Sequence, residues 1–266
     1  MQQNFNEVNR TLYIPLYGKA YVSRKGIILT DKKAEDIWGR EGFELKGKSR
    51  SKWLAYYMAM RARVYDEWTA QRLAQCPDAV VIHIGCGMDS RAQRMGVPAR
   101  WYDVDFPQVI EQRRRYYSEG GGYHMLAGNA AEPSWVEALP AVKTAVVIME
   151  GISMYLSEQA LCELFSALGD RFPEVHILLD SYTVFSAKAS KRKNPINDVG
   201  ASDVWGFDDP MLLVKSASVR FVSEHSMTPA EMIKELALGE RAFFRLMFGG
   251  TIGRRFYRMY EYSVTK

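Results

Sequence analysis

Five short apolar runs alternate with helical patterns in the middle of the chain and predict a parallel β-sheet. The first and fourth are nearly continuous and rich in β-branched residues, as in strands that are buried on both faces, and the third is weaker. The five runs cover residues 79–84, 100–105, 123–127, 144–149 and 175–180. Helical patterns fit residues 108–118 and 157–171 between them. Because strands that alternate with helices of this length imply βαβ units, we expect a doubly wound α/β fold.

The first 76 residues are helical in pattern. Asp31 is placed to cap one helix, and a longer helix is predicted from Ser51 to Gln75, where large apolar residues recur every three or four positions. Pro77 ends this helix. We therefore expect a helical cap over residues 1–76 and a main domain over residues 77–266, the two forming one compact unit.

The C-terminal part carries weaker signals. A polar, irregular segment at about 183–206 is typical of an exposed insertion, and we expect it to act as a lid. A short helix is predicted at 210–215, a strand at 219–225 and a helix start at Pro229. The run 255–264 suggests a closing edge strand, which would complete a mostly parallel, seven-stranded sheet.

Composition and charge narrow the class of protein. The 266 residues include 35 Lys and Arg against 31 Asp and Glu, a net charge of +4, and their basic clusters at 113–115 and 188–193 are typical of solvated surfaces. We therefore expect no nucleic-acid partner. Three cysteines without a Cys-x-x-Cys pair argue against disulfides and a structural zinc site, so no metal is expected. No signal peptide or long apolar run is visible, which indicates a soluble cytoplasmic protein without a membrane partner. The pattern does not indicate an oligomeric state.

A glycine turn directly after the first predicted strand is the clearest candidate for ligand binding. Gly85 and Gly87 lie in the run His-Ile-Gly-Cys-Gly-Met-Asp-Ser-Arg, where glycine lets the backbone turn tightly and approach a ligand closely. Ligands of open α/β sheets bind at the carboxyl ends of the strands. A dinucleotide fingerprint would need glycine at position 90, where Ser90 stands, so the turn favours a nucleoside without phosphates.

Polar side chains follow other strands at the same predicted edge. Asp105 ends the second strand, 20 residues after Gly85, at the position of an acid that accepts hydrogen bonds from ribose hydroxyls. It could equally cap the helix that starts at Pro107. Glu150 ends the fourth strand, and Asn129 follows the third. We expect these side chains to lie around one crevice.

At these residues the chain resembles a known family. It is similar to the leucine carboxyl methyltransferase family, in particular to its bacterial branch of polyketide O-methyltransferases of the tetracenomycin type. The glycine turn followed by Asp-Ser-Arg and the helix with Arg-x-Arg-x-x-Asp carry the resemblance most specifically. The matching segments, in the order of the family, are 19–34, 61–67, 85–91, 101–107 and 149–156.

The resemblance implies a class I, Rossmann-like methyltransferase fold that binds S-adenosylmethionine (SAM). Gly85 and Gly87 would then line the methionine and ribose portion of SAM, and Asp105 would bind the ribose hydroxyls. Glu150 would lie near the amino group of the donor. Arg63 would pair with the carboxylate of the donor, and Lys19 is a weaker candidate for the same contact. Asn129 and Ala130 would lie beside the adenine. The family often has Asp where Asn129 stands, although an amide can still accept a hydrogen bond.

The sequence says less about the molecule that accepts the methyl group. The resemblance implies O-methylation of a small, polyketide-like molecule, and a polyketide carboxyl, a phenol and a protein C-terminal carboxylate all remain open. A carboxylate needs no general base, whereas a phenol is helped by one. We assign no catalytic residue, because His83 lies within a buried strand and is interpreted as a core histidine. Tyr155, Tyr182 and Trp205 are candidates for the acceptor pocket.

Two alternative functions are also compatible with a ligand in this crevice. The first is a nicotinamide-dependent oxidoreductase, against which Ser90 and the lack of a Tyr-x-x-x-Lys pair both count. The second is a binding protein that has kept the fold without catalysis, against which the intact set of Arg63, Gly85, Asp105 and Glu150 counts.

Overall fold

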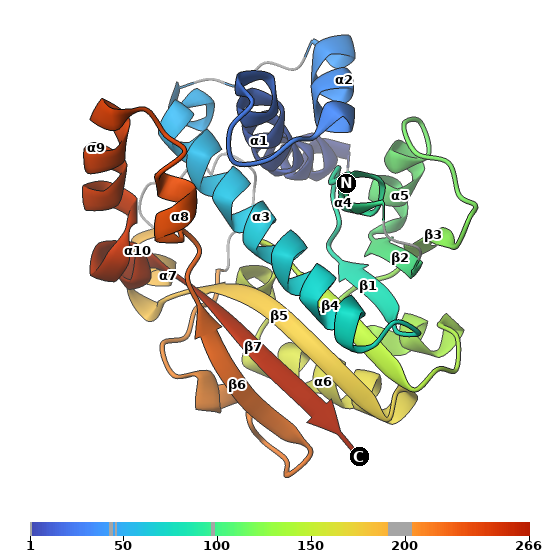
Figure 1. Cartoon of the computed structure of the whole chain (residues 1–266). Helices are drawn as coiled ribbons and strands as arrows, with labels where there is room; N and C mark the ends of the chain where they lie inside the picture. Colours follow the sequence, from blue (N-terminus) through green and yellow to red (C-terminus); the bar gives the residue numbers. More distant parts are fainter. Residues whose placement is uncertain (1, 43–44, 46, 97–98, 191–203) are drawn as a thin grey trace.

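A seven-stranded sheet with helices on both faces forms the core of the computed structural model, which describes residues 2–42, 45, 47–96, 99–190 and 204–266 (Figure 1). The strands are β1 (Val80–Ile84), β2 (Arg100–Asp105), β3 (Tyr123–Ala127), β4 (Thr144–Met149), β5 (Glu174–Tyr182), β6 (Val219–His225) and β7 (Tyr257–Thr265). Their order is β3-β2-β1-β4-β5-β7-β6, and β7 alone pairs antiparallel to its neighbours. The expected α/β fold with a mostly parallel sheet is confirmed.

The position of the last strand corrects one expectation. Strand β7 is not at the edge of the sheet but lies between β5 and β6, so β6 is the edge strand. It also begins at Tyr257 rather than at residue 255, because α10 (Gly250–Phe256) continues to Phe256. Residues on both faces of β7 are buried, among them Met259, Tyr260 and Tyr262, as an interior position requires.

The described residues before Pro77 form helices that cover one face of the sheet. They are α1 (Gln2–Lys25), α2 (Lys32–Glu41), the short 3-10 helix η1 (Gly47–Arg50) and α3 (Lys52–Gln75). The Asp31 carboxylate accepts a hydrogen bond from the Ala34 amide (2.8 Å), and Ser51 caps α3 through the Trp53 amide. The cap at Asp31 and the start of the longer helix at Ser51 are as predicted. Figure 1 shows α3 lying along the sheet with α1 packed against it.

The remaining helices are short apart from one. They are α4 (Arg91–Met95), α5 (Pro107–Arg113), η2 (Pro133–Ala138), η3 (Ser153–Tyr155), α6 (Glu158–Arg171), α7 (Val184–Ser190), η5 (Pro210–Leu213), α8 (Ala230–Ile233) and α9 (Leu238–Phe248), followed by α10. Of the expected lid at 183–206, the structure describes α7 and residues 204–206, and residues 191–203 lie outside the described part. Within the described residues, no helix is both long and apolar enough to cross a membrane.

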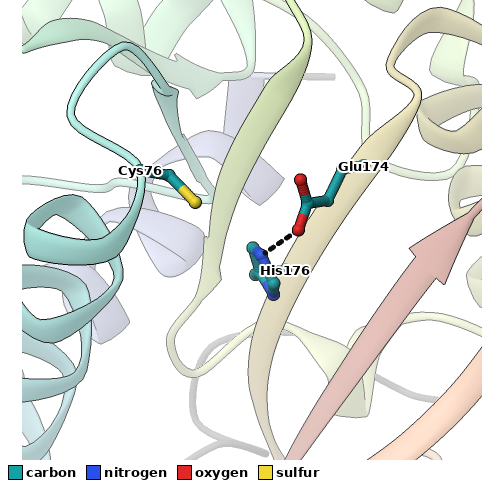
Figure 2. A group of neighbouring side chains, drawn as sticks. All are labelled: Cys76, Glu174 and His176. Atoms are coloured by element: carbon teal, nitrogen blue, oxygen red, sulfur yellow. Dashed lines mark hydrogen bonds and ion pairs between the residues drawn. The ribbon is translucent and has the colours of Figure 1, made fainter.

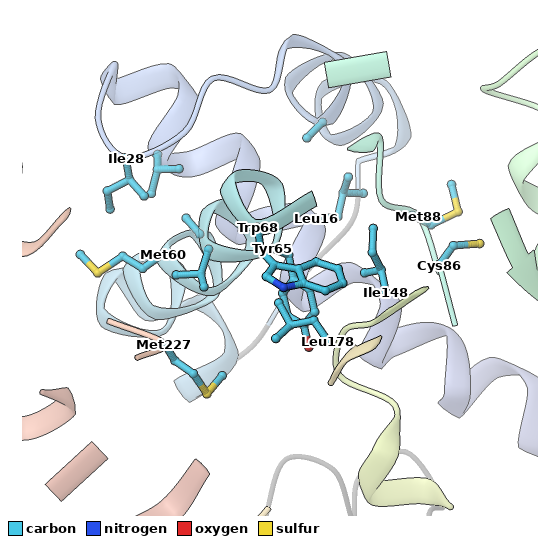
Figure 3. Packing of buried hydrophobic residues seen from close by; sticks show 14 of the residues in the cluster. Leu16, Ile28, Met60, Tyr65, Trp68, Cys86, Met88, Ile148, Leu178 and Met227 are labelled. Atoms are coloured by element: carbon cyan, nitrogen blue, oxygen red, sulfur yellow. The ribbon is translucent and has the colours of Figure 1, made fainter. Parts of the chain in front are cut away.

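Two hydrophobic cores lie on opposite faces of the sheet. On the cap side, Tyr65 and Trp68 of α3 pack with Ile148 and Leu178 from the strands (Figure 3). On the other face, Val147 and other strand residues pack against the apolar stripe of α6. Alternate residues of one strand enter different cores because successive side chains point to opposite faces. This arrangement leaves the ends of the strands free to carry polar side chains.

Candidate active site

A cavity of about 500 Å³ opens at the carboxyl ends of β1, β2 and β4. Its volume is in the range that holds a drug-sized ligand. The sheet contributes the glycine turn after β1 and the residues that end β2 and β4, and the cap contributes Leu12, Leu16 and Lys19 of α1 and Met58 and Arg61 of α3. The crevice that the sequence predicted is therefore closed on one side by the cap.

The glycine turn forms part of the cavity wall and needs glycine for two separate reasons. Gly85 and Gly87 have φ angles of +69° and +49°, which side chains of L-residues rarely adopt. A Cβ atom at Gly85 would also lie 2.1 Å from Cγ2 of Ile152, and one at Gly87 would lie 3.0 Å from Cδ2 of Leu12. Both glycines line the cavity, so any side chain here would narrow it.

Asp105 presents its carboxylate to the same cavity. Oδ2 accepts a hydrogen bond from the Gly87 amide and Oδ1 one from the Phe106 amide, each at 2.8 Å. No side chain caps α5, so the interpretation of Asp105 as a helix cap is not supported. Burial raises the pKa of Asp105, and the two amides only partly offset this. A carboxylate with two further lone pairs is left to accept hydrogen bonds from a ligand.

Glu150 is part of a buried network of charges at the end of β4. Arg61 of α3 donates to Glu150 through Nε and Nη2, at 3.1 and 3.0 Å to Oε1, and Arg91 of α4 donates to Oε2. Burial disfavours the ionised carboxyl, yet the two guanidinium groups hold the pKa of Glu150 at about 2. Glu150 is thus ionised at neutral pH and lies on the cavity wall.

The same arginine reaches the end of β5. Arg61 Nη1 lies 3.3 Å from Oδ2 of Asp180, whose Oδ1 accepts hydrogen bonds from the Tyr65 hydroxyl (2.6 Å) and the Gly151 amide (2.8 Å). Burial raises the pKa of Asp180, while Arg61 and Tyr65 oppose the change. Arg61 therefore connects the cap to two strand ends at once.

Lys19 of α1 provides a second buried cation at the cavity. Its Nζ lies 2.9 Å from Oδ2 of Asp89, and only 3% of its side chain is exposed. Burial opposes the ionisation of Asp89, but Lys19, Arg91 and Arg94 together lower its pKa well below the usual range. An ammonium group has three N–H donors, so Lys19 can bind Asp89 and an anionic ligand group together.

Arg63 is not where the sequence analysis expected it. Its Nε lies 2.8 Å from Glu67, and its Nη1 donates to Glu235 and to the Ile28 carbonyl. Arg63 does not line the cavity. The two arginines differ in their partners. Arg61 reaches Glu150 and Asp180 at the strand ends, whereas Arg63 pairs with Glu67 on its own helix and with Glu235. Arg61 is the residue that sequence reasoning missed.

Asn129 and Ala130 line the cavity after β3. The Asn129 side chain also holds its own turn: Oδ1 accepts a hydrogen bond from the Ala131 amide (3.0 Å), and Nδ2 donates to Glu132 (3.2 Å). The Asn129 side chain therefore orders the loop. The Asn129 backbone carbonyl also accepts a hydrogen bond from Trp135 Nε1 (3.0 Å).

Aromatic side chains form the opposite end of the cavity. Tyr155 and Tyr182 line it as expected, and the ring of Tyr182 meets that of Tyr257 edge to face at 4.7 Å between centroids. Trp205 does not line the cavity, and half of its surface is exposed. Its backbone amide donates to the Met154 carbonyl (2.8 Å). Trp205 is thus an expectation that the structure does not meet.

Two histidines lie near this edge. His83 is buried on β1, lines the cavity, and has Nδ1 3.4 Å from Oδ1 of Asp103. His225 ends β6 and lines a second cavity of about 230 Å³, where its Nε2 lies 2.7 Å from Oε2 of Glu261. The two cavities share Tyr257.

Comparisons with known proteins agree with this geometry. The sequence pattern of the leucine carboxyl methyltransferase family matches residues 9–169. The tetracenomycin polyketide synthesis O-methyltransferase TcmP of Streptomyces glaucescens is 32% identical over 232 residues, covering 86% of each chain. The S-adenosyl-L-methionine-dependent methyltransferase dpfgK of Gibberella zeae is 27% identical over 227 residues, covering 75% of each chain.

Solved structures share the fold at low sequence identity. A Thermobifida fusca protein superposes with a TM-score of 0.58 at 13% identity, covering 85% of this chain and 91% of its own. The magnesium protoporphyrin IX methyltransferase of Synechocystis, solved with bound SAH (the demethylated donor), gives a TM-score of 0.52 at 10% identity, covering 88% and 93%.

Proposed function

The chain belongs to the leucine carboxyl methyltransferase family, and we propose that it methylates a carboxylate of a polyketide-like small molecule. It is a SAM-dependent methyltransferase. The observation that carries the proposal for the site is the joint position of Gly85, Gly87, Asp105 and Glu150 on one cavity wall, with two buried cations from the cap opposite.

The described residues fit SAM. Gly85 and Gly87 leave space where a Cβ atom would intrude, and Asp105 has lone pairs for the ribose hydroxyls. Glu150 would attract the donor's amino group, and Asn129 and Ala130 would flank the adenine. We assign the donor carboxylate to Lys19 and Arg61 in place of Arg63, because a fixed guanidinium and a buried ammonium both line the cavity.

When bound, SAM supplies a methyl group on a sulfonium that is already an activated leaving group. The protein's part is to hold the reacting groups in line and to exclude water. Leu12 and Leu16 of α1 and Ile152 cover the cavity with apolar surface. Arg61 and Glu150 are already paired with each other, so they need not rearrange when a ligand arrives.

A carboxylate acceptor suits the aromatic end of the cavity better than a phenol. Burial raises the pKa of Tyr155, and burial together with Asp180 raises that of Tyr257 well above its usual range, so both stay protonated. Among the described residues at that end, no unpaired carboxylate or histidine is placed to take a proton. A carboxylate is already ionised at neutral pH and needs no base.

The second cavity gives room for an extended acceptor. It adjoins the first at Tyr257 and is lined by Met227 and Phe248 as well as by His225 and Arg254. An aromatic polyketide with its carboxylate beside Tyr155 could extend past Tyr182 in this direction.

The proposal is tested with two measurements on the purified full chain. Calorimetric titration with SAH should show one site, and a parallel titration with NADH should show none. Mass spectrometry after incubation with SAM and aromatic polyketide acids should find a product heavier by one methyl group, and alkaline hydrolysis should restore the acid because an ester was formed. Absence of SAH binding at millimolar concentration would overturn the donor assignment. A product that resists hydrolysis would overturn the carboxylate.

A further inference from the structure

Three residues with metal-binding side chains meet at the edge of the sheet opposite the cavity. Cys76 follows the last residue of α3, and Glu174 and His176 lie near the start of β5 (Figure 2). The thiol sulfur, a carboxylate oxygen and an imidazole nitrogen all lie within 4.8 Å of one another. His176 Nε2 is 3.1 Å from Oε1 of Glu174. The cavity lies at the other ends of the strands, beyond Ile84 and Met149, so this cluster is separate from it.

The residue types and their placement suit a divalent transition metal. Thiolate, imidazole and carboxylate are the three ligand types of zinc, at bond lengths of about 2.0–2.3 Å. Glu174 and His176 are two positions apart on one strand, so their side chains leave the same face and form a fixed pair. Cys76 comes from the turn after α3, where a rotamer change can bring the sulfur closer.

The surroundings of the cluster also resemble those of a metal site. The Thr144 hydroxyl donates to Oε2 of Glu174 (3.2 Å), which orients the carboxylate so that Oε1 faces His176 Nε2. A metal ion bound by both atoms would replace their direct hydrogen bond. The side chains of His176 and Glu174 are 15% and 31% exposed, so an ion can enter and water can occupy a fourth position.

We propose that Cys76, Glu174 and His176 bind one zinc-like divalent ion and thereby join the end of α3 to the start of β5. The sequence predicts no metal, because its three cysteines include no Cys-x-x-Cys pair. Here the three ligands come from two segments almost 100 residues apart, which only the fold brings together. The proposal does not depend on the methyltransferase assignment.

Cobalt(II) is the probe, because it replaces zinc and gives visible spectra. Titration of the full-length, metal-free protein should saturate at one ion per chain, with a thiolate-to-cobalt charge-transfer band and the d–d bands of a tetrahedral site, both removed by added zinc. Cys76→Ser should lose the charge-transfer band, and both Cys76→Ser and His176→Ala should bind at least about tenfold more weakly. Cys162→Ser is the matched control, since Cys162 is also a free, partly buried cysteine but lies on α6, and it should behave like the wild type.

The outcomes are decisive in both directions. Zinc should raise the melting temperature of the wild type and of Cys162→Ser, because a ligand that binds the folded state stabilises that state. Zinc should not raise the melting temperature of Cys76→Ser, which lacks one ligand. Circular dichroism checks that each variant is folded, and SAH affinity should stay unchanged in all of them. Equal cobalt binding in the wild type and Cys76→Ser, or spectra without a charge-transfer band, would overturn the site.

Discussion

Arg61 and Glu150 form a buried salt bridge, 3.0 Å from Nη2 to Oε1, between the middle of α3 and the residue that follows the central strand β4. Each side chain is 5% exposed, and both line the cavity. The pair joins the two parts of the chain at the position where we place the amino-acid portion of SAM. Its strength and charge therefore bear on both stability and ligand binding.

Arg61 and Arg63 provide a matched pair of variants two residues apart. Arg61→Lys should weaken SAH binding by at least about tenfold, or 1.4 kcal/mol, because an ammonium cannot bridge Glu150, Asp180 and a ligand as the guanidinium does. Arg63→Lys should leave the affinity within about twofold, since Arg63 contacts Glu67 and Glu235 outside the cavity. Calorimetry measures both affinities, and a thermal melt checks folding. Equal losses in the two variants would contradict the assignment.

Asp105→Asn tests the contact to ribose. The change keeps the shape of the side chain but removes the charge, so SAH affinity should fall by about 1–3 kcal/mol. Asp78→Asn is the control, because Asp78 is exposed just before β1, at the opposite end of the strand from the glycine turn. Its affinity for SAH should match that of the wild type. An Asp105→Asn protein that binds SAH normally would remove Asp105 from the site.

Gly85→Ala and Gly26→Ala separate backbone strain from loss of space. Their φ angles are nearly equal, at +69° and +67°, so each alanine should cost about 1–2 kcal/mol of stability from the backbone alone. A Cβ atom at Gly26 meets nothing within 4 Å, whereas one at Gly85 meets Ile152 in the cavity wall. Chemical denaturation measures the stabilities. Only Gly85→Ala should lose SAH binding, and a similar loss in Gly26→Ala would refute the steric argument.

The pKa of Glu150 gives a prediction with a defined pH window. It lies at about 2 in the folded protein against 4.5 for the unperturbed group, so the ionised form stabilises the fold fully above about pH 4.5 and this contribution disappears as the pH falls toward 2. Glu150→Gln should reduce the free energy of unfolding by about 3 kcal/mol at pH 7, because Arg61 and Arg91 lose a buried partner. Denaturation at several pH values should show this difference shrinking below pH 4.5.

A control for that experiment lies on the surface. Glu158 pairs with Lys215, and both side chains are well exposed, so Glu158→Gln should change the free energy of unfolding little at any pH. A Glu150→Gln difference that stayed constant down to pH 2 would show that Glu150 is not held ionised by its partners.

The sheet could be predicted from sequence because its strands are buried on both faces. Val80 to Ile84 and Thr144 to Met149 are continuous apolar runs, and no helical period competes with them. The position of β7 could not be predicted in the same way. Glu261 is a charged residue inside that strand, and its burial depends on Arg72 and His225, which come from distant elements.

The candidate site was predictable where it follows strand ends, as at Gly85, Asp105 and Glu150, because parallel strands end at one edge. It was not predictable where contacts between distant elements determine which side chains line the cavity. The Arg-x-Arg motif does not say which arginine faces the cavity, because Arg63 stands three residues after the buried Met60 just as Arg61 stands four after the buried Tyr57. The local sequence likewise does not show that Trp205 is half exposed and lies outside the cavity.

The buried ion pairs between the first 76 residues and the rest limit how this chain can be engineered. Lys19 meets Asp89, Asp66 meets Arg91 and Arg94, and Arg61 meets Glu150 across that division. A fragment beginning at Pro77 would carry several charges without their counterions, and we infer that it cannot be produced as a stable protein. A chimera that borrows this N-terminal region from a relative would have to exchange both members of every such pair together.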